Sequence, residues 1–97
     1  MSNPLVLIVD DETDTTEGLA DFLLLHDYQS AQAASLKEAK DKVAETRFDA
    51  VLLDLRLPDG NALEWLPDLR DQHPHLAVIV ITGQGDEMGP LLRRFLP

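Results

Sequence analysis

Residues 5–11, with the sequence LVLIVDD, give the clearest indication of the fold. The first five of these residues are apolar without alternation, which is typical of a strand buried on both faces of a parallel sheet. Two aspartates, Asp10 and Asp11, follow that strand directly. Because ligands of open α/β sheets bind outside the carboxyl ends of the strands, the same stretch indicates where a functional site should be sought.

Similar patterns divide the rest of the chain into strands and helices. Three further apolar runs predict strands, at residues 50–53, at 77–81 and, more weakly, at 28–33. Amphipathic patterns predict helices between the strands, at residues 15–25, at 35–46 and from 61 to 70. Ser35 with Glu38 forms a capping box that marks the start of the second helix. This alternation predicts an α/β domain in which helices cover both faces of a parallel sheet.

The segment between the third strand and the third helix is less regular. Residues 57–60, with the sequence LPDG, predict a turn. Pro67 falls inside the pattern of the third helix, where it would remove a backbone hydrogen bond. The third helix is therefore expected to kink at Pro67 or to start late.

Composition and charge narrow the class of function. The chain has 97 residues, enough for one domain over residues 1–97, and 18 acidic against 8 basic residues give a formal charge of −10. This charge argues against contact with nucleic acid or with an anionic membrane surface. No cysteine is present, so thiolate metal sites and disulfides are excluded. With only short apolar runs, the chain is expected to be cytoplasmic.

Acidic side chains follow two of the predicted strands. Asp54 lies between Leu53 and Leu55, where an unpaired buried carboxylate would be costly. If the first and third strands are neighbours, their spacing of ~4.8 Å brings Asp54 close to Asp10 and Asp11. Mutual repulsion would then raise at least one pKa unless a cation such as Mg²⁺ is bound. Since a carboxylate can attack phosphorus to form an acyl phosphate, the cluster favours magnesium-dependent phosphate chemistry.

Other readings of single residues stay open. Asp10 or Asp11 taken alone could simply cap the following helix. Thr82 follows the fourth strand, but a threonine is at home in any strand or turn. The three histidines fall near helix ends and are expected at the surface, at positions 26, 73 and 75. Phe22 and Trp65 are expected in the core.

Together these motifs resemble the receiver domain of bacterial two-component response regulators. Residues 9–12, VDDE, are similar to the acidic pair after the family's first strand, and residues 52–60 to its phosphoacceptor strand and following turn. Residues 81–83 resemble the strand end that carries a switch hydroxyl. The resemblance covers residues 5 to about 87 and implies a flavodoxin-like, doubly wound parallel sheet with strand order 2-1-3-4.

The resemblance also implies a function and a set of site residues. Asp54 would accept a phosphoryl group from a sensor histidine kinase or a phosphotransfer protein, which makes the chain a signalling phosphoacceptor rather than an enzyme. Mg²⁺ would be held by Asp11, Asp54 and the backbone carbonyl of Arg56, with Asp10 contributing through water. Thr82 would then bond to a phosphoryl oxygen and report the added charge.

The sequence departs from the family after its fourth strand. Receivers have five strand–helix units and a lysine after the fifth strand, whereas the lysines of this chain all lie on the second predicted helix, at positions 37, 40 and 42. Residues 95–97 resemble either the start of a fifth strand or the end of the preceding helix. We therefore expect a receiver truncated at its C-terminus to about four strands, whose uncovered sheet edge favours a homodimer.

Two other functions fit parts of the pattern. A degenerate receiver could bind a partner protein without being switched by phosphorylation, since the lysine is missing. A phosphatase of the haloacid dehalogenase type would also place a nucleophilic aspartate after a parallel strand. That family needs a second aspartate two residues later, where this chain has Arg56, so the phosphatase reading is the weaker of the two.

Overall fold

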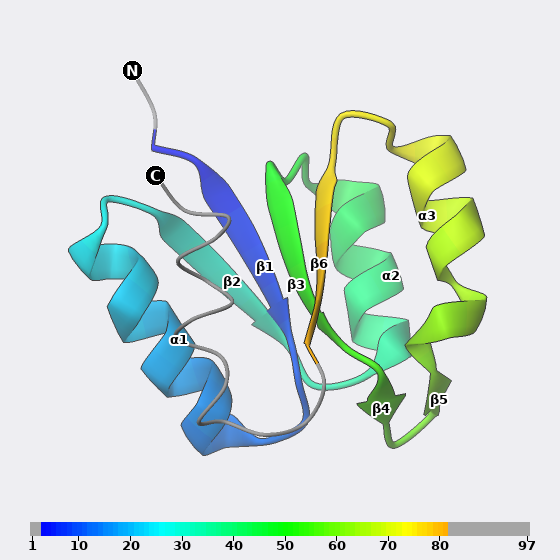
Figure 1. The fold of residues 1–97 in the computed structure, drawn as a ribbon, viewed down its shortest axis with the longest axis horizontal. Coiled ribbons are helices and arrows are strands. Elements are labelled where there is room, and N and C mark those ends of the chain that lie inside the picture. Colours follow the sequence, from blue (N-terminus) through cyan, green and yellow to red (C-terminus); the bar gives the residue numbers. More distant parts are fainter. Residues whose placement is uncertain (1–2, 82–97) are drawn as a thin grey trace.

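A parallel sheet forms the centre of the molecule. The structure, a computed structural model, describes residues 3–81 of the chain. Within this range the strands of the main sheet are β1 (Leu5–Val9), β2 (Gln29–Ala33), β3 (Ala50–Asp54) and β6 (Ala77–Ile81). They are parallel and lie in the order β2-β1-β3-β6 (Figure 1), which confirms the predicted order 2-1-3-4.

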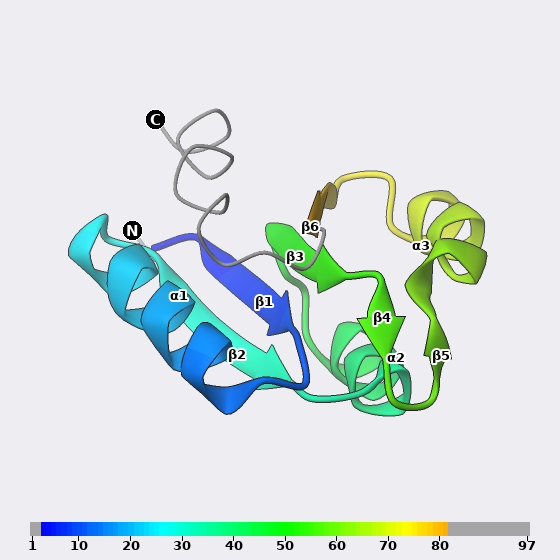
Figure 2. The same cartoon turned by 60° about the horizontal axis from the view of Figure 1, so that its bottom comes forward.

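Helices cover both faces of this sheet, as predicted. Helix α1 (Thr13–Leu25) lies on one face, and α2 (Leu36–Glu45) and α3 (Leu66–Gln72) lie on the other (Figures 1 and 2). Successive side chains of β1 point to opposite faces, so Leu7 packs in the core beneath α2 and α3, while Ile8 packs in the core beneath α1. Both leave no exposed surface, which explains why β1 is apolar without alternation.

The predicted capping box is present at the start of α2. The Ser35 hydroxyl accepts a hydrogen bond from the Glu38 N–H at 3.1 Å, and the Glu38 carboxylate accepts one from the Ala34 N–H at 3.0 Å. The Ser35 bond satisfies one N–H that the first turn of α2 cannot pair internally, and the Glu38 bond connects that turn to the residue before the cap.

The segment after β3 differs from its prediction. The predicted turn is confirmed as the tip of an antiparallel hairpin formed by β4 (Arg56–Leu57) and β5 (Gly60–Asn61). The third helix is present, but its predicted start at residue 61 is wrong. A short 3₁₀ turn, Ala62–Glu64, follows the hairpin, and α3 begins only at Leu66. Pro67 lies in the first turn of α3, where its missing N–H breaks no intrahelical bond. The late start expected from Pro67 is thus confirmed.

Several expectations concern the C-terminal part of the chain. Thr82 and residues 83–97, including the segment that resembles a fifth strand, lie outside the described residues. Among residues 3–81, the outer edge of β6 has no partner strand, and homodimerisation through an open edge stays a prediction. In the same range, no helix combines the length and apolar character needed to cross a membrane.

Candidate functional site

The sheet register brings the predicted acidic residues together. Val9 of β1 is paired with Leu53 of β3, so that Asp10 and Asp54 follow at the same end of two adjacent strands. One carboxylate oxygen from each of Asp10, Asp11 and Asp54 lies within 4.8 Å of the others. This is the cluster expected from neighbouring first and third strands, and we call it the acidic cluster.

Asp10 is the buried member of the acidic cluster. Its side chain is held in place because Oδ1 accepts a hydrogen bond from the Glu12 N–H at 3.0 Å, and the residue is only 6 % exposed. Burial raises the pKa of Asp10 to about 6, and the negative charges of Asp54, Asp11 and Glu12 act in the same direction, against the opposing Glu12 hydrogen bond. The free energy of an ionised Asp10 is therefore unfavourable unless a cation is nearby.

The helix-cap reading of Asp10 is wrong, because the N-cap residue of α1 is Glu12, whose side chain makes no capping hydrogen bond. Asp10 lies two residues earlier and accepts the Glu12 N–H, and its side chain lies beside Asp54. Asp11, by contrast, is exposed.

Asp54 is the last residue of β3 and is partly buried. Its Oδ1 accepts a hydrogen bond from the Arg56 N–H at 3.2 Å, so the carboxylate is oriented by the backbone of the loop that follows it. Arg56 itself lies in β4, two residues beyond Asp54. The role implied for its carbonyl group stays a prediction.

The donor set of the acidic cluster fits a hard divalent cation. All three side chains offer carboxylate oxygens, which Mg²⁺ and Ca²⁺ prefer, and the cluster contains no nitrogen or sulfur ligand. Mg²⁺ is commonly held by one or two carboxylates together with phosphate oxygens, which matches a shallow cluster with one exposed member. Asp10, Asp11 and Asp54 are the side chains that would hold it.

The histidines lie away from the acidic cluster, as expected. His26 terminates α1, and its ring packs against that of Phe22 at a tilt of 44°, with centroids 4.6 Å apart. His73 terminates α3 and lies beside His75, with ring centroids 6.0 Å apart. Trp65 is buried in the core on the α2 and α3 side of the sheet, as predicted.

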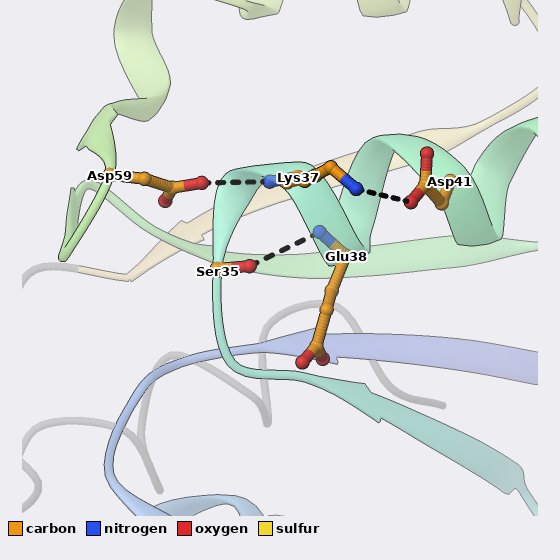
Figure 3. Close-up of polar contacts among 5 residues, drawn as sticks. All are labelled: Ser35, Lys37, Glu38, Asp41 and Asp59. Atoms are coloured by element: carbon orange, nitrogen blue, oxygen red, sulfur yellow. Dashed lines mark hydrogen bonds and ion pairs between the residues drawn. The ribbon is translucent and has the colours of Figure 1, made fainter.

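Sequence reasoning missed the contact made by Asp59. The sequence predicts only a turn at this residue, but its Oδ1 accepts the Leu36 N–H at 2.8 Å. Its Oδ2 accepts the Lys37 N–H at 3.0 Å (Figure 3). These two hydrogen bonds lower the pKa of Asp59. The partners are 22 and 23 residues away in sequence, so no local pattern could have predicted the contact.

Comparison with known proteins places this geometry in context. A family model described as the response regulator receiver domain matches residues 6–90. The response regulator protein PilR of Pseudomonas aeruginosa is 39 % identical over 85 residues, which cover 88 % of this chain and 19 % of the relative. The sporulation initiation phosphotransferase F of Bacillus subtilis is 34 % identical over 86 residues, which cover 89 % of this chain and 69 % of the relative.

Solved structures of receiver proteins also resemble the chain in fold. A receiver domain protein described as CheY-like, from Methanospirillum hungatei, superposes with a TM-score of 0.81 at 30 % identity, covering 86 % of this chain and 66 % of that one. A response regulator from Burkholderia pseudomallei, described with a phosphorylated aspartic acid, a calcium ion and citrate, superposes with a TM-score of 0.78 at 27 % identity. That match covers 84 % of this chain and 48 % of the other.

Proposed function

This chain belongs to the family of response regulator receiver domains, and we propose that Asp54 accepts a phosphoryl group from a phosphohistidine of a sensor histidine kinase or a phosphotransfer protein. The observation that supports this proposal is the acidic cluster, in which Asp54 lies with Asp10 and Asp11 at the carboxyl end of β1 and β3. The chain would act as a signalling phosphoacceptor and not as an enzyme with a separate substrate.

The proposed transfer is a single displacement at phosphorus. We assign the attack to Oδ2 of Asp54, because Oδ1 accepts the Arg56 N–H. The new O–P bond forms as the P–N bond of the phosphohistidine breaks, and the imidazole nitrogen leaves with the electron pair. The product is an acyl phosphate on Asp54 and a free histidine on the donor.

The remaining residues of the acidic cluster prepare Asp54 for this step. Asp11 and Asp54, with the Arg56 carbonyl, would bind Mg²⁺ directly, and Asp10 would contribute through water. When bound, Mg²⁺ supplies positive charge that offsets the charge of the transferring phosphoryl group. The Arg56 N–H keeps the Asp54 carboxylate in one orientation, and the hydroxyl of Thr82 would bond to a phosphoryl oxygen of the product.

A phosphorylated relative supports the same assignment. The structure of the Burkholderia response regulator contains a phosphorylated aspartic acid and a calcium ion. In this chain, Asp54 is the member of the acidic cluster that ends β3, and its neighbours are carboxylates suited to such a cation.

The test is phosphorylation by a small acyl phosphate. The chain is incubated with acetyl phosphate and Mg²⁺, and its intact mass is expected to increase by one phosphoryl group, with no increase when a chelator is present. Asp54→Asn should abolish the added mass. Asp68→Asn is the matched control, since Asp68 is exposed in the first turn of α3 and should leave the mass increase unchanged. Phosphorylation of Asp54→Asn to the same extent would refute the assignment.

A further inference from the structure

Of the two loops that supply the acidic cluster, one is attached to the end of β2 and the other to the start of α2. The Asp10 N–H donates to the carbonyl of Ala33, the last residue of β2, at 3.0 Å. On the other side, Asp59 of the β4–β5 hairpin accepts the N–H groups of Leu36 and Lys37. Residues 33–37 therefore contact the loop after β1 and the loop after β3, and Figure 2 shows the hairpin beside α2.

The hairpin that follows Asp54, formed by β4 and β5 with Asp59 in the turn between them, is short, and its strands are paired with each other. Arg56 is paired with Asn61 across the two strands, and the Ala62 N–H donates to the Leu55 carbonyl at 3.1 Å. Because the Arg56 N–H also donates to Asp54, a displacement of the hairpin would be transmitted to the Asp54 carboxylate.

The tip of the hairpin approaches α2 closely. Gly60 has a φ of +151°, which residues other than glycine rarely adopt. A Cβ at this position would lie 3.0 Å from Cδ1 of Leu36. The close approach places the carboxylate of Asp59 within hydrogen-bond distance of two backbone N–H groups at the start of α2.

The start of α2 suits a carboxylate in this position. The first N–H groups of a helix have no partner inside it, and the helix dipole favours a negative charge there. Figure 3 shows how the donors are divided: Ser35 accepts the N–H of Glu38, and Asp59 accepts that of Lys37. The hydrogen bonds from Leu36 and Lys37 favour the ionised form of Asp59 and lower its pKa.

We propose that Asp59 is a positioning residue for the metal site. By attaching the hairpin tip to the start of α2, it holds the Asp54 carboxylate and the Arg56 backbone in the arrangement that binds Mg²⁺. This inference rests on the proposed function, because it concerns the cation that the acidic cluster would bind. Asp59 is not a member of the acidic cluster, so it would act through the hairpin.

The experiment measures Mg²⁺ binding directly, by isothermal titration calorimetry on the 97-residue chain. Loss of a residue that orients metal ligands lowers metal affinity by about tenfold or more, and we expect an increase of that size in the dissociation constant of Asp59→Ala. Asp59→Asn keeps one acceptor without the charge and should show a smaller increase. This conservative variant also serves if Asp59→Ala fails to fold.

Ser35→Ala is the matched control. It removes the hydrogen bond to the Glu38 N–H at the same helix start but leaves the contact of Asp59 intact. A general weakening of α2 would affect Ser35→Ala and Asp59→Ala alike, whereas the proposal expects an unchanged Mg²⁺ dissociation constant for Ser35→Ala. Hydrogen exchange at the Leu36 and Lys37 amides should accelerate in Asp59→Ala, whether or not metal is present.

The outcomes separate this inference from the proposed function. If the wild-type chain binds no Mg²⁺, the metal site of the proposed function is refuted, and the inference with it. If the wild-type chain binds Mg²⁺ and Asp59→Ala and Asp59→Asn bind it equally well, only the inference is overturned. Equal losses of affinity in Ser35→Ala and Asp59→Ala would overturn it too.

Discussion

Replacing Asp10 by asparagine should stabilise the metal-free protein at neutral pH. Asparagine has nearly the same shape and retains an oxygen that can accept the Glu12 N–H, so the local structure at the start of α1 is preserved. The substitution removes only the negative charge that is buried beside Asp54 and Asp11.

The magnitude follows from the pKa of Asp10. Burial raises this pKa from 3.8 to about 6 in the folded protein, and each pKa unit corresponds to about 1.4 kcal/mol, so the ionised carboxylate costs at most about 3 kcal/mol. The acidic cluster is open to solvent on the side of Asp11, and screening there reduces the cost. We expect Asp10→Asn to increase the free energy of unfolding by about 1 to 2 kcal/mol.

Because the pKa of Asp10 is raised, the stabilisation by Asp10→Asn should appear only in a defined pH range. Because the folded protein binds the Asp10 proton more tightly than the unfolded chain, the protonated carboxyl contributes stability below pH 3.8. That contribution is lost as the pH rises through about 6. The difference between Asp10→Asn and the wild type should therefore be near zero at low pH, grow across this interval and stay constant above it.

The assay is urea denaturation followed by the fluorescence of Trp65, the single tryptophan, which is buried and becomes exposed on unfolding. Urea titrations from below pH 3.8 to mildly alkaline pH, with a chelator present, give the difference in unfolding free energy at each pH. Asp68→Asn, at an exposed site, controls for the change in net charge. The reasoning is refuted if Asp10→Asn is less stable than the wild type above pH 7, or if the difference is independent of pH.

Three further substitutions test the packing and backbone geometry that support the site. Leu53→Ala, at a fully buried position of β3, should lower the free energy of unfolding by about 2 to 5 kcal/mol, whereas Leu24→Ala, at a side chain that is 69 % exposed, should change it by less than about 0.5 kcal/mol. Comparable losses in both variants would contradict the assigned core. Gly60→Ala should cost about 1 to 3 kcal/mol, because alanine must adopt the φ of +151° next to Leu36. Unchanged stability in urea would show that the hairpin tip relaxes.

Much of the fold could be predicted because its signals are local. The apolar run of β1 needs no partner to be recognised, and Ser35 with Glu38 marks the start of α2 within one helical turn. Asp54 could be singled out because its carboxylate follows a buried run. Placing it beside Asp10 needed one assumption, that the first and third strands are neighbours, and the sheet order confirms that assumption.

The segment from β4 to α3 could not be predicted in the same way. Its residues are compatible both with a helix and with a hairpin followed by a 3₁₀ turn. In the folded chain the hairpin forms, and its turn residue Asp59 contacts the start of α2. Asn61 shows the ambiguity: it was assigned to the start of a helix, and its side chain accepts the Leu63 N–H at the start of the 3₁₀ turn instead. The cap itself was local, but the type of helix that it begins was not.

Three features can be predicted from residues that are neighbours in the sequence. They are the succession of strands and helices along the chain, the buried character of β1 and the acidic residues at the strand ends. Repulsion among the three carboxylates predicts at least one raised pKa, but its location at the buried Asp10 follows only from the folded chain, as does the contact of Asp59 with α2. Each involves groups that are far apart in the chain, Asp10 with Asp54 and Asp59 with Leu36. Burial, repulsion between carboxylates and a hydrogen bond across 23 residues arise only when the chain is folded, and they leave no periodicity in the sequence.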